Sequence, residues 1–162
     1  MKKSVFYLVM FALAGVVFLG SCNKDDDNDD DQNIVPPTNT TELSAKLDGV
    51  QFTASLPITG LLDTDDNLIG IIGDNANGTL MVTLSGDISV GSHTATTGTT
   101  ENISWDPDGG FTFFSKPVTI VISKHDVVNR RIEATFSGTL EGTSPPAINL
   151  TDGVLKINYQ VI

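Results

Sequence analysis

Three oxygen-bearing side chains at alternate positions form the first candidate site in this sequence. Asp63, Asp65 and Asn67 supply carboxylate and amide oxygens, which are the ligands that Ca²⁺ prefers. Asp74 stands at the twelfth position of an EF-hand loop, but Leu68 occupies the position where that loop requires glycine. The segment therefore predicts no EF-hand. Two alternatives stay open, a looser structural calcium site or a solvated acidic loop, and no other cofactor is expected.

The sequence offers two adjacent pairs of residues that could take part in nucleophilic catalysis, and neither has suitable spacing. Ser92 and His93 are adjacent, and neighbours on a strand point to opposite faces. His125 and Asp126 have the same spacing and lie in a predicted turn. The sequence contains no Gly-x-Ser-x-Gly elbow. We expect no catalytic residues, and a hydrolase that uses a pair of carboxylates is kept only as the last alternative.

Two aromatic residues flank a single turn and are candidates for ligand contact. Trp105 ends a short predicted strand, and Phe114 lies in the next one, where it breaks the alternation of apolar and polar residues. An exposed aromatic ring can stack on a sugar or meet a partner protein. The alternative is that both rings fill the core of the domain.

The beginning of the chain has the layout of an export signal. Lys2 and Lys3 precede an apolar run, residues 5–19, that is shorter than the roughly 20 residues of a membrane-spanning helix. Gly20 and Ser21 then precede Cys22, the only cysteine in the chain. A lone thiol in an exported protein needs a use, and acylation supplies one. We therefore expect residues 1–21 to be a cleaved signal peptide and Cys22 to carry the lipid.

The residues around this cysteine resemble known lipoprotein signals. Leu19-Gly20-Ser21-Cys22 is similar to a lipobox, the site at which bacterial lipoproteins are cut and acylated. The residues Lys24, Asp25, Asp26 and Asp27 resemble the signal that sends lipoproteins of Bacteroidota to the outer face of the outer membrane. The resemblance implies a lipid-anchored protein at the cell surface, with the membrane as its first partner.

Charge and composition divide the rest of the chain into a linker and one domain. Residues 22–41 are almost free of apolar side chains and carry six aspartates, so we expect a disordered acidic linker. A flexible chain of this length spans about 25 Å. Residues 42–162 hold 14 acidic and 6 basic residues, a net charge of −8. A domain this acidic repels nucleic acid, which we exclude as a partner.

The elements that must position these residues are strands. From Glu42 onward apolar residues recur with a period of two, in about eight to ten short runs separated by turns such as Asp48-Gly49. Residues 61–67 are expected to form a loop, and residues 92–96 an edge strand. No run of ten or more residues after Cys22 shows a helical apolar stripe. The pattern predicts an all-β domain, a single antiparallel β-sandwich or, alternatively, a closed β-barrel.

Three segments of this domain resemble a family of unknown function that is common in Bacteroidota lipoproteins. They are residues 43–54, 131–140 and 150–159, and they consist of strands and turns, so they imply a fold and no catalytic residues. The function expected from these observations is a non-enzymatic binding module for a glycan, a small ligand or an envelope protein. The alternative is an assembly subunit that pairs with its partner through an edge strand.

Overall fold

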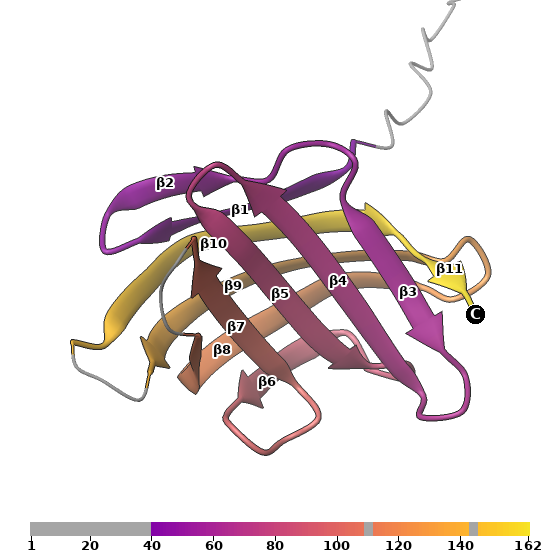
Figure 1. Ribbon diagram of the computed structural model, residues 1–162. Helices are drawn as coiled ribbons and strands as arrows, with labels where there is room; N and C mark the ends of the chain where they lie inside the picture. Colours follow the sequence, from indigo (N-terminus) through magenta and orange to yellow (C-terminus); the bar gives the residue numbers. More distant parts are fainter. Residues whose placement is uncertain (1–39, 109–111, 143–145) are drawn as a thin grey trace, which may run out of the picture. The chain divides into compact units, whose positions relative to one another are not determined.

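The computed structural model of the protein describes residues 40–108, 112–142 and 146–162 (Figure 1). The predicted signal peptide, Cys22 and the acidic segment that follows it lie outside the described residues. The described part contains eleven strands: β1 (Glu42–Leu47), β2 (Val50–Thr53), β3 (Thr59–Asp63), β4 (Leu68–Asn75), β5 (Gly78–Ser85), β6 (Gly91–Ala95), β7 (Asn102–Pro107), β8 (Phe113–Asp126), β9 (Arg131–Glu141), β10 (Ile148–Asn158) and β11 (Gln160–Val161).

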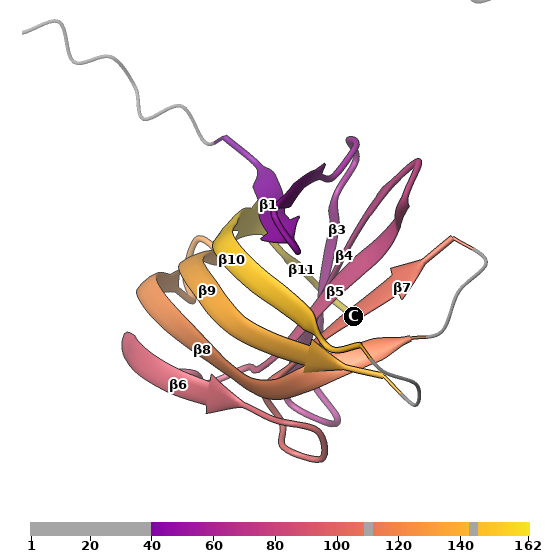
Figure 2. The ribbon, with the colours of Figure 1, turned by 90° about the vertical axis from the view of Figure 1, so that its left-hand side faces the viewer.

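The predicted all-β class is confirmed, and the strands form one curled sheet. Its order is β11-β3-β4-β5-β7-β8-β9-β10-β1-β2, and β6 pairs with β8 beside this path. The sheet is an open half-barrel, in which strands β3, β4, β5 and β7 cross in front of strands β8, β9 and β10 (Figures 1 and 2). We call the first group the front arm. The second group, together with β6, β1 and β2, is the back arm.

The predicted antiparallel pairing is found between all neighbouring strands except one pair, β11 and β3. β11 lies parallel to β3, with Gln160 opposite Leu61 and Val161 opposite Leu62. The chain passes from β10 in the back arm directly to β11 at the edge of the front arm, with only Tyr159 between them. The expected loop at residues 61–67 is wrong in its first half, because Leu61 to Asp63 belong to β3. No helix long and apolar enough to span a membrane occurs among the described residues.

The core lies between the two arms. It consists of the apolar side chains that recur at every second position of the strands and point inward. In β5, buried residues alternate with partly buried ones along the whole strand, so one face packs inward and the other faces outward. The core has satellite residues at its margin, including Leu62, Phe113 and Ile148. Its buried apolar side chains come from both arms: Leu43, Ala45, Phe52, Ile69, Ile71, Leu80, Val82, Leu84, Ile88, Ala95, Ile103, Trp105, Val118, Ile120, Ile122, Ile132, Ala134, Phe136, Leu140, Leu150, Leu155, Ile157 and Tyr159.

A bulge in β10 bends the back arm over this core. Leu150 pairs with Gly138 and Gly153 pairs with Phe136, so β10 carries one extra residue in this interval. Asp152 takes up the bend with a φ of 51°. Gly153 leaves room for the ring of Phe136, which a Cβ atom at residue 153 would strike. The bulge therefore depends on a glycine at this position.

Candidate binding face on the front arm

The predicted calcium ligands lie in and after the end of β3, and they are used by the local backbone. Oδ1 of Asp63 accepts hydrogen bonds from the backbone N–H groups of Asp65, at 2.9 Å, and Asp66, at 3.4 Å. Asn67 has a φ of 54°, as the tight turn into β4 requires. Within the described residues, no three histidine, cysteine or acidic side chains are grouped as metal ligands. The calcium site therefore stays a prediction of the sequence.

Both histidines hold the loop between β5 and β6. Nδ1 of His125 lies 2.8 Å from the carbonyl oxygen of Ile88, and Nε2 of His93 lies 2.8 Å from the carbonyl oxygen of Ser89. Ser92 is exposed while its neighbour His93 is partly buried, as expected for alternate faces of a strand. The geometry assigns both imidazole rings to positioning this loop.

Trp105 is not available to a ligand, and this prediction from the sequence is wrong. Its side chain lies in the core with 6% of its surface exposed, and its ring meets the ring of Phe52 edge to face at 5.2 Å. The reason is the strand period. Ile103 and Trp105 point inward from β7, and Ser104 between them points outward.

Phe114 lies on the outside, as its break in the alternation predicts. It is 39% exposed and pairs with Ser104, while the adjacent Phe113 packs against the core. The pairing extends across the front arm, because Ser104 is opposite Met81 and Met81 is opposite Ile72. Ile72 is 37% exposed. We call Ile72, Met81, Ser104 and Phe114 the central row, an apolar row interrupted by one serine.

A second row on the same outer face carries oxygen side chains. Asp74, Thr79 and Asp106 are paired across β4, β5 and β7, each two residues along its strand from a member of the central row. The hydroxyl of Thr79 donates a hydrogen bond of 2.5 Å to Asp74. We call these three residues the acidic row. Residues two apart on a strand are separated by about 7 Å, which sets the distance between the two rows.

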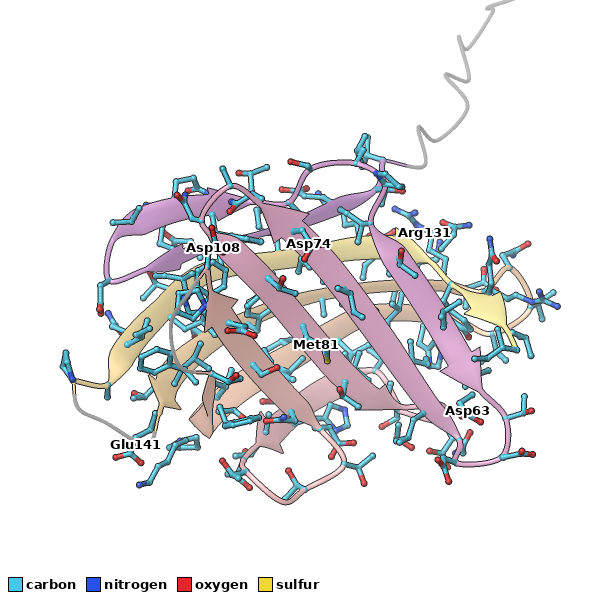
Figure 3. All side chains as sticks on the ribbon, viewed as in Figure 1. Asp63, Asp74, Met81, Asp108, Arg131 and Glu141 are labelled. Atoms are coloured by element: carbon cyan, nitrogen blue, oxygen red, sulfur yellow. The ribbon has the colours of Figure 1, made fainter. Side chains whose placement is uncertain are left out.

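A pocket of about 290 Å³ opens at the acidic row. Asp74 and Asp108 lie toward one end of the front arm, and Met81 lies nearer its middle (Figure 3). The pocket combines carboxylate, amide and hydroxyl groups, which accept and donate hydrogen bonds. It is lined by Asp74, Asn75, Gly78, Thr79, Asp106, Pro107 and Asp108.

The two rows together can bind a ligand that has one apolar side and one hydroxylated side. The ring of Phe114 and the side chains of Ile72 and Met81 offer an apolar surface, and the acidic row offers acceptors beside it. Carbohydrates have this division, since a pyranose ring presents C–H groups on its faces and hydroxyl groups at its rim. The face is therefore a candidate binding site for a sugar.

A second groove lies on the outer face of the back arm, over the bulge of β10. It is larger, about 620 Å³, and its hydroxyl groups alternate with two valines. It has no exposed aromatic ring, and its only carboxylate, Asp152, forms an ion pair of 2.8 Å with Lys46. We favour the front arm for this reason. The groove is lined by Thr119, Val121, Thr135, Phe136, Ser137, Thr151, Asp152, Gly153 and Val154.

Ile72 and Met81 are candidate site residues that the sequence analysis missed. Each one follows an apolar residue directly, in Ile71-Ile72 and Leu80-Met81, so each breaks the period of two as Phe114 does. The same signal marks all three residues. It shows that a side chain points outward, but it does not show that the three lie in one row.

Comparison with protein families, curated proteins and solved structures finds no match for this chain. The resemblance of residues 43–54, 131–140 and 150–159 to a lipoprotein family therefore stays a prediction of the sequence. The same holds for the lipidation at Cys22 and for the export signal at residues 24–27, since these residues lie outside the described part of the chain.

Proposed function

We propose that this protein is a lipid-anchored outer-membrane lipoprotein whose β-domain is a non-enzymatic binding module for a neutral glycan. The anchor is Cys22, preceded by the lipobox-like sequence and followed by the acidic residues Asp25, Asp26 and Asp27. These residues support a location at the cell surface, where glycans are the abundant ligands.

One observation carries the choice of ligand, namely the central row beside the acidic row on the outer face of the front arm. Phe114 and Ile72 are each more than one third exposed although they are large and apolar. Stacking of a sugar on Phe114 would place hydroxyl groups toward Thr79 and Asp106. The net charge of −8 over residues 42–162 disfavours anionic polymers, so the expected ligand is neutral.

The proposal is tested with the purified full-length chain and a panel of neutral oligosaccharides, by titration calorimetry. We expect at least one member of the panel to bind, and the Phe114→Ala variant to bind it about tenfold more weakly, a loss of roughly 1.4 kcal/mol. Asp106→Asn should also weaken binding, because an acceptor for sugar hydroxyl groups is replaced by a group that also donates.

A matched control is available on the back arm. Val121 is 42% exposed, close to the exposure of Phe114, and lies in the other groove. Val121→Ala should leave the affinity unchanged. If Val121→Ala weakens binding and Phe114→Ala does not, the ligand lies on the back arm. If no neutral oligosaccharide binds, the glycan proposal is wrong.

A second candidate function is supported by the edge strand β6. Among the described strands β6 pairs only with β8, and its residues Gly91 to Ala95 include no charged residue and no proline. Natural edge strands usually carry such residues to prevent pairing with other chains. An assembly subunit that pairs through β6 would become monomeric in the Thr94→Lys variant. Thr119→Lys, on the neighbouring position of β8, is the control, and size-exclusion chromatography with light scattering distinguishes the two.

A further inference from the structure

The turn between β8 and β9 exposes two consecutive valines. Val127 is 61% exposed and Val128 is 91% exposed, the largest value among the exposed large hydrophobic residues of the described chain. Exposed turns normally consist of glycine, proline, asparagine, aspartate or serine, each for a conformational reason. Valine offers none of these conformational advantages, and the two side chains are not buried. Neither the turn nor the core of the domain therefore explains why valine occupies these positions.

The geometry of the turn holds the valines outward. The carboxylate of Asp126 accepts one hydrogen bond from the backbone N–H of Asn129, at 2.9 Å, and a second from its side-chain amide, at 2.8 Å. Arg130 follows with a φ of 53° and returns the chain to β9. The two valines therefore occupy the central positions of an ordered turn. We call Val127 and Val128 the hairpin tip.

The hairpin tip lies at the same end of the domain as the junction with the N-terminal segment. Nη2 of Arg131 donates a hydrogen bond of 3.2 Å to the carbonyl oxygen of Thr40, the first described residue. Arg131 follows Val128 by only three residues. Figure 1 shows the junction and the β8–β9 turn toward one side, and the β1–β2 turn toward the other. The first described residue, Thr40, therefore lies near the hairpin tip.

Three basic residues lie within four positions of the hairpin tip in the sequence of a domain that is otherwise acidic, and one of them, Arg131, is buried. Lys124, Arg130 and Arg131 are half of the six basic residues in 42–162. Arg131 is paired with Glu133, whereas Lys124 and Arg130 form no ion pair within the described residues. The carboxylate nearest to the tip, that of Asp126, is engaged by Asn129. Apolar side chains flanked by cations are typical of segments that rest on a membrane surface.

We propose that the hairpin tip contacts the headgroup layer of the membrane that holds the lipid anchor. The inference rests on the proposed lipid anchor at Cys22. A flexible chain as long as residues 22–41 has a root-mean-square span of about 25 Å, so the anchor would hold the start of the domain, and the hairpin tip beside it, near the membrane. Contact at this end orients the domain. The pocket at Asp74 and Asp108 lies farther from the membrane in this orientation, since Figure 3 shows both residues on the side of Arg131 that leads toward the β1–β2 turn.

The test uses the lipidated full-length protein in vesicles of phosphatidylcholine and phosphatidylglycerol that contain a doxyl-labelled phospholipid. One variant, Val128→Trp, reports on the hairpin tip. Its matched control, Val50→Trp, replaces a valine that is 66% exposed at the start of β2, directly after the β1–β2 turn. Both variants retain the buried Trp105, so its emission is common to the two. We expect the doxyl lipid to quench Val128→Trp about twofold more strongly than Val50→Trp, with a blue-shifted emission only in the former.

Flotation of the vesicles tests the lipid anchor independently of the contact made by the hairpin tip. If the protein floats and the two reporters are quenched equally, the hairpin tip does not contact the membrane and the inference is wrong, while the anchor stands. If the wild-type protein floats no better than Cys22→Ala, the lipid anchor is wrong and the inference falls with it. Replacement of Val127 and Val128 by serine should leave flotation intact and increase the accessibility of the domain to added protease.

Discussion

The hydroxyl group of Tyr159 lies 3.1 Å from Nε2 of His125, and Nδ1 of the same ring lies 2.8 Å from the carbonyl oxygen of Ile88. A carbonyl oxygen only accepts, so Nδ1 carries the proton. In the neutral ring Nε2 then accepts the hydrogen bond of the tyrosine. This chain of two bonds connects the link between β10 and β11, strand β8 and the loop before β6, which are three separate parts of the domain.

Tyr159→Phe should lower the free energy of unfolding by about 1 kcal/mol, because it removes one partly buried hydrogen bond and keeps the ring. Urea unfolding measures the change. A double-mutant cycle with His125→Ala tests the cause, since the two substitutions should be less than additive by a similar amount. Additivity within about 0.3 kcal/mol would show that the hydroxyl and the imidazole do not depend on each other.

The burial of Tyr159 should make the folded protein less stable in alkaline solution. Burial raises the pKa of its hydroxyl group, so the folded protein keeps the proton at a pH where the unfolded chain has released it. The stabilising contribution is complete below the ordinary tyrosine pKa of about 10 and is lost as the pH rises through the folded value. The wild-type protein should therefore lose more stability than Tyr159→Phe between about pH 8 and pH 11 in urea unfolding. Equal losses in the two proteins would contradict the prediction.

Arg131→Met should destabilise the domain by about 2 kcal/mol. Arg131 is 6% exposed, and its guanidinium group bonds Glu133, Asn158 and the carbonyl oxygen of Thr40, all of which lose their donor. Lys124→Met, at an exposed position of β8, is the control and should change stability by less than about 0.5 kcal/mol. Hydrogen exchange should also become faster at Glu42, the first residue of β1. Equal effects of the two variants in urea unfolding would refute this role of Arg131.

Gly153→Ala and Gly70→Ala should have opposite effects on stability. A Cβ atom at residue 153 would strike the ring and the backbone oxygen of Phe136, and the bulge of β10 leaves no room to shift. We expect a loss of about 2 kcal/mol or more. At Gly70, on the outer face of the front arm, nothing lies within 4 Å of the added atom. There alanine should raise stability by about 0.5 kcal/mol, because it restricts the unfolded chain. Thermal unfolding distinguishes the two, and a neutral Gly153→Ala would contradict the packing argument.

The sequence predicts the strands well because each strand follows a local rule. Alternation of buried and partly buried residues in β5 and the turn at Asp48-Gly49 depend only on neighbours in the chain. The same rule identifies Phe114 as an outward residue. It leaves Trp105 undecided, because a strand pattern gives two faces and does not say which one meets the other arm.

The candidate site depends on contacts between residues far apart in the chain. Local sequence patterns do not predict such contacts. Phe114 joins Ile72 and Met81 only through the pairing of four strands, β4, β5, β7 and β8. Arg131 meets Thr40 across 91 residues. The exposure of the hairpin tip could have been predicted, since the sequence places two valines in a turn. Its relation to the junction at Thr40 requires the structure.

The pairing of β1 with β10 has a consequence for the order in which the chain is made. Glu42 bonds Lys156, 114 residues later, so β1 can pair with β2 at once but with β10 only after nearly all of the other strands have been synthesised. Until then the core between the arms cannot be completed, because β10 supplies Leu150, Leu155 and Ile157 to it. The growing chain therefore lacks a complete core until β10 has been made. A chain without a complete core would suit the narrow export channel through which the proposed lipoprotein would pass.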